Sequence, residues 1–357
     1  MTEVHGRVAD GFEAVAHDFG LTLGPDSGAA FAAVVDGEPV VDVWGGAGWR
    51  EDTLALLFSG GKGLVAVCVL MLIERGGLDL AAPVARYWPE FEAKEVLVRH
   101  VVSHTAGLPG LRRRFAAGEL LDGRKLAAEL AAEEPFWAPG TRLAYHALSF
   151  GWLCDELMRR VDGRSIGRFL ADEIAGPLGL ELWIGLPPAE EPRVVQLVRA
   201  EGYGVTFFGD VPDPLLGALY GELLDGPFRW NDAVFHRAEI PAANGIGAAR
   251  SIARLYAALP TLLAKDVLDL GRTELSRDLC AVTRRPYAFG VGFELQTELG
   301  SFGPPANAFG HTGSGGSVHG AWPDERVGFS YTPNELRSES DDGRAQRVLA
   351  ALHDALR

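Results

Sequence analysis

A serine and a lysine three residues apart form the first pair in this sequence that could act together in a reaction. They frame the segment Ser59-Gly60-Gly61-Lys62, and the ten residues that follow from position 64 are all apolar. A helix beginning at Ser59 would place both side chains on one face of its first turn. The serine could then act as a nucleophile, and a desolvated lysine could lose its proton and serve as its base. An N-cap serine beside a lysine that extends toward solvent would show the same spacing.

Tyr145 is the second candidate, because it follows a turn sequence and precedes a predicted helix. The turn is Ala138-Pro139-Gly140, which would present a short extended segment carrying the tyrosine. A phenol in that place could relay a proton between a nucleophile and a leaving group. The alternative is a tyrosine that packs beside the turn. The adjacent His146 either tunes such a site or packs in the core.

The third candidate is the run His311-Thr312-Gly313-Ser314, which lies in a strand-like segment rich in small residues. Small residues allow a substrate to lie close along the edge of a strand. The Ser314 amide would then donate a hydrogen bond to an oxyanion, and the Ser59 amide at a helix N-terminus would be the second donor. A glycine-rich hairpin without a site is the competing interpretation.

The three motifs, in this order, resemble those of the serine β-lactamase and penicillin-binding-protein superfamily. Ser59 and Lys62 form its Ser-x-x-Lys motif, Tyr145 its tyrosine motif, and His311 to Gly313 its Lys/His-Thr-Gly motif. Within the superfamily, the sequence is most similar to the class C branch, and there to the family VIII carboxylesterases. The resemblance implies an α+β fold in which an antiparallel sheet is flanked by helices and carries an inserted, mainly helical domain.

The resemblance also implies a role for each catalytic residue. Ser59 would be the nucleophile of an acyl-enzyme, while Lys62 and Tyr145 would share the general acid and base steps. The backbone amides of Ser59 and Ser314 would form the oxyanion hole. We therefore expect a serine carboxylesterase that acts on small-molecule esters and needs no metal or organic cofactor.

Two departures from the family pattern concern substrate recognition. The resemblance places His311, Thr312 and Gly313 at the acyl side of the substrate, and Asn244 at the cleft from the helical side. Ala147 stands where β-lactamases have an asparagine that holds the acylamido group, and His311 stands where many have a lysine. Histidine is mostly neutral near pH 7 and offers no fixed cation to a substrate carboxylate. Both changes favour esters over anionic β-lactams.

Other activities of the same fold stay open at this point. One is an acyltransferase, in which an alcohol or an amine replaces water, and another is a weak β-lactamase or D-aminopeptidase. A different class of function is a penicillin-type sensor that is acylated and does not turn over. Retention of both Lys62 and Tyr145 argues against the sensor, because a sensor has no need of deacylation.

A metal site has little support in the sequence. His100 and His104 have the spacing of a ligand pair on one helical turn, but no glutamate completes the zinc-binding pattern. The segment around His104 favours a structural histidine in a turn.

Charge and cysteine content disfavour some partners and favour a cytoplasmic location. The 357 residues include 33 Lys and Arg against 48 Asp and Glu, which gives a net charge of −15 and disfavours nucleic acids and anionic membranes. The three cysteines, Cys68, Cys154 and Cys280, are scattered, so we expect buried reduced thiols in a cytoplasmic protein. The first 20 residues lack the pattern of a signal peptide. The oligomeric state is not determined by the sequence.

Hydrophobic periodicity predicts the elements that must position these residues. We expect a sheet completed by both ends of the chain, with residues 1–95 and 245–357 in one α/β sandwich domain and residues 96–244 in a mainly helical domain. The active site would lie in the cleft between them, shaped by loops within 185–240. The predicted strands are 31–35, 40–44, 287–295, 308–313, 317–322 and 326–331, and the predicted helices are 11–19, 59–75, 119–132, 146–161, 165–175, 248–259 and 343–356.

Overall fold

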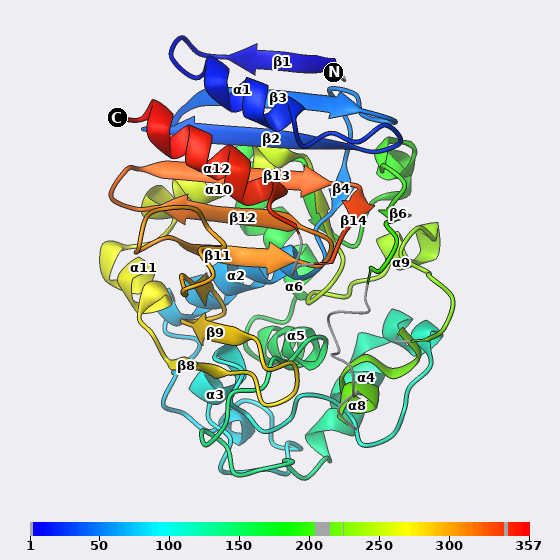
Figure 1. Cartoon of the computed structure of the whole chain (residues 1–357). Coiled ribbons are helices and arrows are strands. Elements are labelled where there is room, and N and C mark those ends of the chain that lie inside the picture. The colour runs from blue at the N-terminus through cyan, green and yellow to red at the C-terminus, as the bar shows by residue number, and fades with distance from the viewer. Residues whose placement is uncertain (1–2, 204–214, 224, 339–341) are drawn as a thin grey trace.

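A large antiparallel sheet is built from both ends of the chain, and its strand β1 lies at one edge of the molecule (Figure 1). The computed structural model describes residues 3–203, 215–223, 225–338 and 342–357. Within these residues, nine strands form the sheet in the order β1-β3-β2-β13-β12-β11-β10-β9-β8. The bounds are β1 Val4–Val8, β2 Gly28–Val35, β3 Glu38–Gly46, β8 Ser276–Leu279, β9 Pro286–Phe289, β10 Glu294–Leu295, β11 Phe309–Gly313, β12 Ser317–Trp322 and β13 Val327–Pro333.

Helices cover both faces of this sheet. On one face, α1 (Glu13–Gly20) and α12 (Arg344–Ala355) pack together over β2, β3 and β13, and on the other face α10 (Ala249–Leu262) packs against β2 and β13 (Figure 1). Strand β2 is therefore buried on both sides, with Phe31 toward α12 and Ala32 toward α10. Burial on both faces explains its nearly continuous apolar sequence.

The strands predicted at 31–35 and 40–44 are confirmed, and they form the hairpin of β2 and β3. Its two turn residues, Asp36 and Gly37, both have positive φ angles, of 54° and 87°. This is the pattern of a type I′ turn, which matches the twist of the flanking strands. The two outermost strands, β1 and β8, were not predicted. Most of their residues are exposed, so they carry no apolar alternation.

The predicted helix at 59–75 is confirmed, with a tighter first turn. Residues Ser59–Gly61 form a 3₁₀ turn, η1, and Lys62–Glu74 form α2. All residues of α2 from Lys62 to Leu72 are buried, because the helix lies between the sheet and the helices α5 (Ser149–Val161), α6 (Ile166–Leu170) and α11 (Lys265–Arg272). A helix that is apolar on all sides belongs in a core, which is what its sequence predicts.

The remaining elements surround α2 and the end of the sheet. Among the described residues, no helix is both long and apolar enough to cross a membrane. A three-stranded sheet, β4-β7-β5, joins the segment before Ser59 to later parts of the chain. The other elements are β4 Ala55–Leu56, β5 Leu182–Ile184, β6 Val198–Arg199, β7 Gly245–Gly247, β14 Glu335–Leu336, η2 Val84–Arg86, α3 Val98–Val102, η3 Ala117–Leu121, α4 Gly123–Ala131, the π-helical η4 Ala171–Ala175, α7 Gly176–Leu178, η5 Pro188–Arg193, α8 Leu216–Tyr220, η6 Gly221–Leu223 and α9 Ala233–Arg237.

One hydrophobic core connects the segments that the sequence assigns to two domains. Its buried members run from Leu54 to Leu336 and include α2, the middle helices and α10. The division into 1–95 with 245–357 and 96–244 stays a prediction.

Candidate active site

Ser59 is presented on a turn whose preceding residue has an unusual backbone conformation. Phe58 has a φ of 48° and a ψ of −131°, a backbone conformation that residues other than glycine rarely adopt. The segment is held in place by a hydrogen bond from Leu57 N to Gly245 O (2.8 Å). The Phe58 ring packs edge-on against Trp230, with ring centroids 5.4 Å apart. Strain of this kind is maintained only by a surrounding structure that requires it, and it is typical of functional sites.

Lys62 is completely buried behind Ser59 and contacts it directly. Its Nζ donates hydrogen bonds to the carbonyl oxygens of Ala147 and Ala242, both at 2.8 Å, and lies 3.0 Å from Ser59 Oγ. Burial lowers the pKa of Lys62 well below its usual value, while the charge of Glu294 acts in the opposite direction. A neutral amine has two N–H groups, and the two carbonyls accept both. The remaining lone pair can therefore accept a proton from Ser59.

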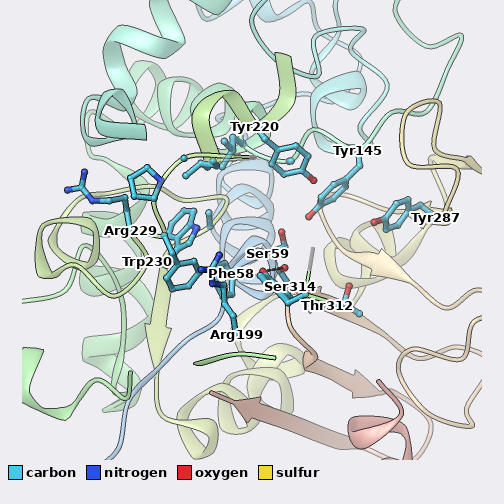
Figure 2. A pocket seen from close by; sticks show the side chains of 18 residues that line it. Phe58, Ser59, Tyr145, Arg199, Tyr220, Arg229, Trp230, Tyr287, Thr312 and Ser314 are labelled. Atoms are coloured by element: carbon cyan, nitrogen blue, oxygen red, sulfur yellow. Dashed lines mark hydrogen bonds between the residues drawn. The ribbon is translucent and has the colours of Figure 1, made fainter. Parts of the chain in front are cut away.

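Tyr145 lies on the other side of the nucleophile. Its hydroxyl points toward Ser59 (Figure 2), and its ring centroid is 4.8 Å from Lys62 Nζ. Burial, with a smaller contribution from Tyr287, raises the pKa of Tyr145 well above that of a free phenol, while the nearby Ser59 hydroxyl lowers it. The phenol oxygen has no hydrogen-bond partner among the described residues. The site therefore holds a protonated phenol beside the serine hydroxyl.

His104 fixes the segment that carries Tyr145, and His146 packs behind it. The carbonyl oxygen of His104 accepts a hydrogen bond from Ala144 N (3.1 Å), and its Nδ1 accepts one from His146 N (3.0 Å). Tyr145 is thereby held from both sides. The fully buried His146 ring bonds the Ala144 carbonyl through Nδ1, and burial lowers its pKa to about 4. Of the two interpretations of His146, the structure favours packing, while His104 is the structural histidine that the sequence favours.

Neither member of the candidate metal pair has a free Nδ1. His100 Nδ1 accepts a hydrogen bond from Leu97 N (3.2 Å), and His104 Nδ1 is used as described above. The described residues contain no group of three or more His, Cys, Asp or Glu side chains arranged to hold a metal ion.

Strand β11 brings the third motif next to the nucleophile. Some of its side chains face the pocket, and others face the buried interior. Thr312 and Ser314 line the same pocket as Ser59. At Gly313, a β-carbon would lie 2.2 Å from Leu57 O, so only glycine allows the strand to cross this close to the turn. His311 is buried and does not line the pocket, which corrects the expectation that it faces the substrate. The alternation of side chains along a strand is the reason.

His311 is a neutral core residue beside Tyr145. Its Nδ1 bonds the Thr312 carbonyl at 2.7 Å, and its ring centroid lies 6.2 Å from that of Tyr145. Burial, with a smaller contribution from Lys62, lowers the pKa of His311 to about 3. The strand therefore offers no cation at the position where relatives with a lysine have one.

Glu294 is a site residue that the sequence analysis missed. It is buried in β10, and its Oε2 accepts hydrogen bonds from Thr312 N (3.0 Å) and Thr312 Oγ1 (2.7 Å). The Thr312 hydroxyl proton is thus used inside the protein and is not offered to a substrate. A single glutamate in a short strand has no local signal, because only the pairing of β10 with β11 places it here.

Asn244 does not reach the pocket, contrary to expectation. Its fully buried side-chain amide accepts a hydrogen bond from Ile240 N (2.9 Å) and donates to the carbonyls of Phe235 (2.8 Å) and Ala238. These bonds hold the loop that supplies the Ala242 carbonyl to Lys62. Asn244 is therefore a positioning residue in this structure.

The pocket in front of Ser59 has a volume of about 200 Å³ and is strongly aromatic. As the sequence predicts, loops within 185–240 form much of its wall, although residues 204–214 and 224 of that stretch lie outside the described residues. Tyr203, also missed by the sequence analysis, bonds Ser314 Oγ through its hydroxyl at 2.7 Å. Besides Tyr145, the aromatic residues that line the pocket are Phe58, Tyr203, Tyr220, Phe228, Trp230 and Tyr287 (Figure 2).

Comparison with known proteins identifies the family. A family model described as beta-lactamase matches residues 24–353. The chain belongs to the beta-lactamase family. Within it, the esterase/beta-lactamase LipL of Mycobacterium tuberculosis is 35% identical over 335 residues, which are 87% of this chain and 78% of that protein.

Two solved structures place this beta-lactamase family member among penicillin-binding-protein homologues and esterases. A penicillin-binding-protein homologue from Caulobacter crescentus has a TM-score of 0.92 and 34% identity, covering 99% of this chain and all of that one. A family VIII carboxylesterase has a TM-score of 0.89 and 33% identity, with the same coverage. The superfamily and the α+β fold predicted from the motifs are confirmed.

Proposed function

We propose that this protein is a serine carboxylesterase that cleaves small-molecule esters through an acyl-enzyme on Ser59. One observation carries the proposal: the buried amine of Lys62 lies 3.0 Å from Ser59 Oγ, with two carbonyls as its other partners. Burial favours the neutral amine, and the arrangement then leaves a base in contact with a hydroxyl. The aromatic pocket beside the pair provides room for an ester.

In the proposed reaction, Ser59 Oγ attacks the ester carbonyl and passes its proton to Lys62. The backbone amides of Ser59 and Ser314 stabilise the oxyanion, and the Ser59 amide has no partner inside its turn because it is the first residue of η1. Tyr145 lies where it can give a proton to the departing alcohol, and Lys62 can restore that proton. Water then attacks the acyl-enzyme by the same steps and releases the acid.

Features of the strand edge support esters over β-lactams. The position of the acylamide-binding asparagine is Ala147, His311 is neutral, and the Thr312 hydroxyl donates to Glu294. A β-lactam carboxylate would therefore meet neither a cation nor a free hydroxyl donor on this strand. An ester needs less assistance, because an alcohol is a better leaving group than an amine.

The decisive experiment compares a series of 4-nitrophenyl esters with the β-lactam nitrocefin, using Ser59→Ala as the control. We expect turnover of the esters, little hydrolysis of nitrocefin, and loss of both in the variant. Strong nitrocefin hydrolysis without ester turnover would contradict the esterase assignment, and activity that survives in Ser59→Ala would contradict the mechanism. Added alcohols that divert the acyl group from water would identify an acyltransferase, and a stable acylated protein without turnover would identify a sensor.

We also propose a cytoplasmic location. The three cysteines are free and buried in the structure, and burial raises the pKa of the Cys68 and Cys154 thiols. Buried thiols without disulfides suit a reducing compartment. Fractionation of the native host, with an antibody against the protein, tests this location.

A further inference from the structure

The pocket has two walls of different electrostatic character. On the β11 side, the carboxyl group of Glu294 lies behind Thr312, His311 is neutral, and Tyr145 and Tyr287 contribute uncharged rings. Among the described residues that line this side of the pocket, none carries a positive charge. The opposite side carries the arginines of the pocket, Arg199 and Arg229, among the described lining residues.

These two arginines differ in whether an acidic side chain already pairs with them. Arg229 forms an ion pair with Asp232. Arg199 is exposed, and its guanidinium carbon lies 5.1 Å from the centroid of the Phe228 ring. No acidic side chain of the described residues pairs with it. Arg199 is therefore a cation in the pocket whose hydrogen-bond donors are available to a ligand.

Backbone hydrogen bonds fix the position of Arg199 in the chain, so the attachment point of its side chain is defined. Strand β6 pairs in parallel with β14, with Arg199 opposite Leu336. On either side of Arg199, Val198 N donates to Asn334 O (2.8 Å) and Ala200 N donates to Leu336 O (3.0 Å). A cation anchored in this way has less backbone freedom to lose when it binds a ligand.

The position of Arg199 relative to Tyr145 indicates which part of a substrate it meets. In Figure 2, Tyr145 and Tyr287 lie on one side of Ser59, and Arg199 approaches from the other, near Phe58 and Trp230. Tyr145 is the residue that would protonate the departing alcohol, so the alcohol belongs on its side. The acyl group then extends toward Arg199, and strand β11, which the resemblance assigns to the acyl group, would instead face the alcohol.

We propose that Arg199 binds a carboxylate at the far end of the acyl group, so that the preferred substrates are monoesters of dicarboxylic acids. This inference rests on the proposed esterase function and adds its substrate class. Planar carboxylates match the fork of guanidinium N–H groups, and such charge-assisted hydrogen bonds are stronger than neutral ones. The position of Arg199 also distinguishes these esters from β-lactams. The carboxylate of a β-lactam would lie on the β11 side, where no described lining residue carries a positive charge.

The test compares two esters of the same shape, the 4-nitrophenyl monoester of adipic acid and its neutral terminal amide. We expect kcat/KM to favour the carboxylate by on the order of tenfold, the effect of about 1.4 kcal/mol. The preference should weaken as salt is added, because the guanidinium is exposed. Arg199→Gln should remove the preference, and Arg199→Glu should transfer it to the ester of 6-aminohexanoic acid. Arg229→Gln is the matched control and should keep the preference.

The possible failures are distinguishable. Equal Ser59-dependent hydrolysis of both esters, or loss of the preference in Arg229→Gln as well, would overturn the role of Arg199 and leave the esterase function standing. Absence of turnover for both esters would overturn the esterase function itself. Recognition is then decided by calorimetric binding of the two esters to Ser59→Ala, where equal affinities would overturn the carboxylate site and an Arg199-dependent difference would support it.

Discussion

At the scale of single residues, the environment of Lys62 determines what its amine can do. Burial disfavours the ammonium form, and the carbonyls of Ala147 and Ala242 take up two N–H groups. The contact with Ser59 is then the place where a proton can be exchanged. A side chain that only stabilised the core would not need an amine nitrogen in contact with Ser59 Oγ.

This view of Lys62 predicts the behaviour of two variants. Lys62→Met removes the base, and Lys62→Arg replaces it with a group that stays charged at all accessible pH values. We expect kcat/KM to fall by roughly 10²–10⁴ in both, the usual contribution of a general base. Lys62→Arg should unfold at lower urea concentration than Lys62→Met, because it buries a charge.

The measurements are hydrolysis of 4-nitrophenyl butyrate and urea unfolding followed by circular dichroism. Near-normal activity in a well-folded Lys62→Met would exclude a catalytic role for this lysine. Equal stability of the two variants would instead contradict the buried, neutral state of the amine.

At the scale of elements, the site depends on contacts between segments that are distant in the sequence. The turn at Ser59 is held by β7, the Tyr145 segment by His104, and strand β11 by close passage of Gly313 over Leu57. Backbone atoms take part in each of these supports, and His104 adds its side-chain Nδ1. The loop before β7 adds the Ala242 carbonyl, and Asn244 determines its position.

Asn244 therefore offers a test of positioning. Asn244→Ala leaves the Ile240 amide and two carbonyls without their partner, at a cost of about 1–3 kcal/mol for each buried unsatisfied group. We expect lower stability to urea and, in the fraction that stays folded, a lower kcat with little change in KM, because Ala242 no longer holds Lys62.

Active-site titration with a fluorophosphonate, where phosphonylation of Ser59 with release of fluoride remains measurable, gives kcat per folded molecule. A purely structural role predicts fewer folded molecules with unchanged kcat. That result would contradict the positioning of Lys62 through this loop.

The sequence predicted the elements that carry apolar periodicity and the motifs with fixed local spacing. The helix at Lys62 and the strands on either side of Asp36 are examples, since each is determined by residues close in the chain. Edge strands β1 and β8 were missed because their exposed residues have no pattern. Glu294 and Arg199 were missed because their relation to Ser59 exists only after strand pairing. His311 was wrongly expected in the pocket, because the side of β11 on which its side chain lies depends on the alternation of side chains along the strand.

At the scale of the whole molecule, one core encloses the site and several neutral histidines. His146, His311 and His319 are buried in it, and burial lowers the pKa of His146 to about 4 and those of His311 and His319 to about 3. An unpaired charge in such a core is costly. In the native state these positions stay uncharged until the pH falls to about 4 for His146 and about 3 for His311 and His319.

The stability of the protein should consequently fall as the pH falls below 6.5. The unfolded chain takes up a proton at each of these histidines near pH 6.5, whereas the native chain does so only near pH 4 for His146 and pH 3 for His311 and His319. Between these values the unfolded state binds more protons, so the free energy of unfolding rises with pH and decreases on acidification. Urea unfolding across this range measures the slope, which should be shallower in His319→Gln because one proton site is lost. Stability that is constant or increases between pH 6.5 and pH 4 would show that the histidines are not buried in their neutral form.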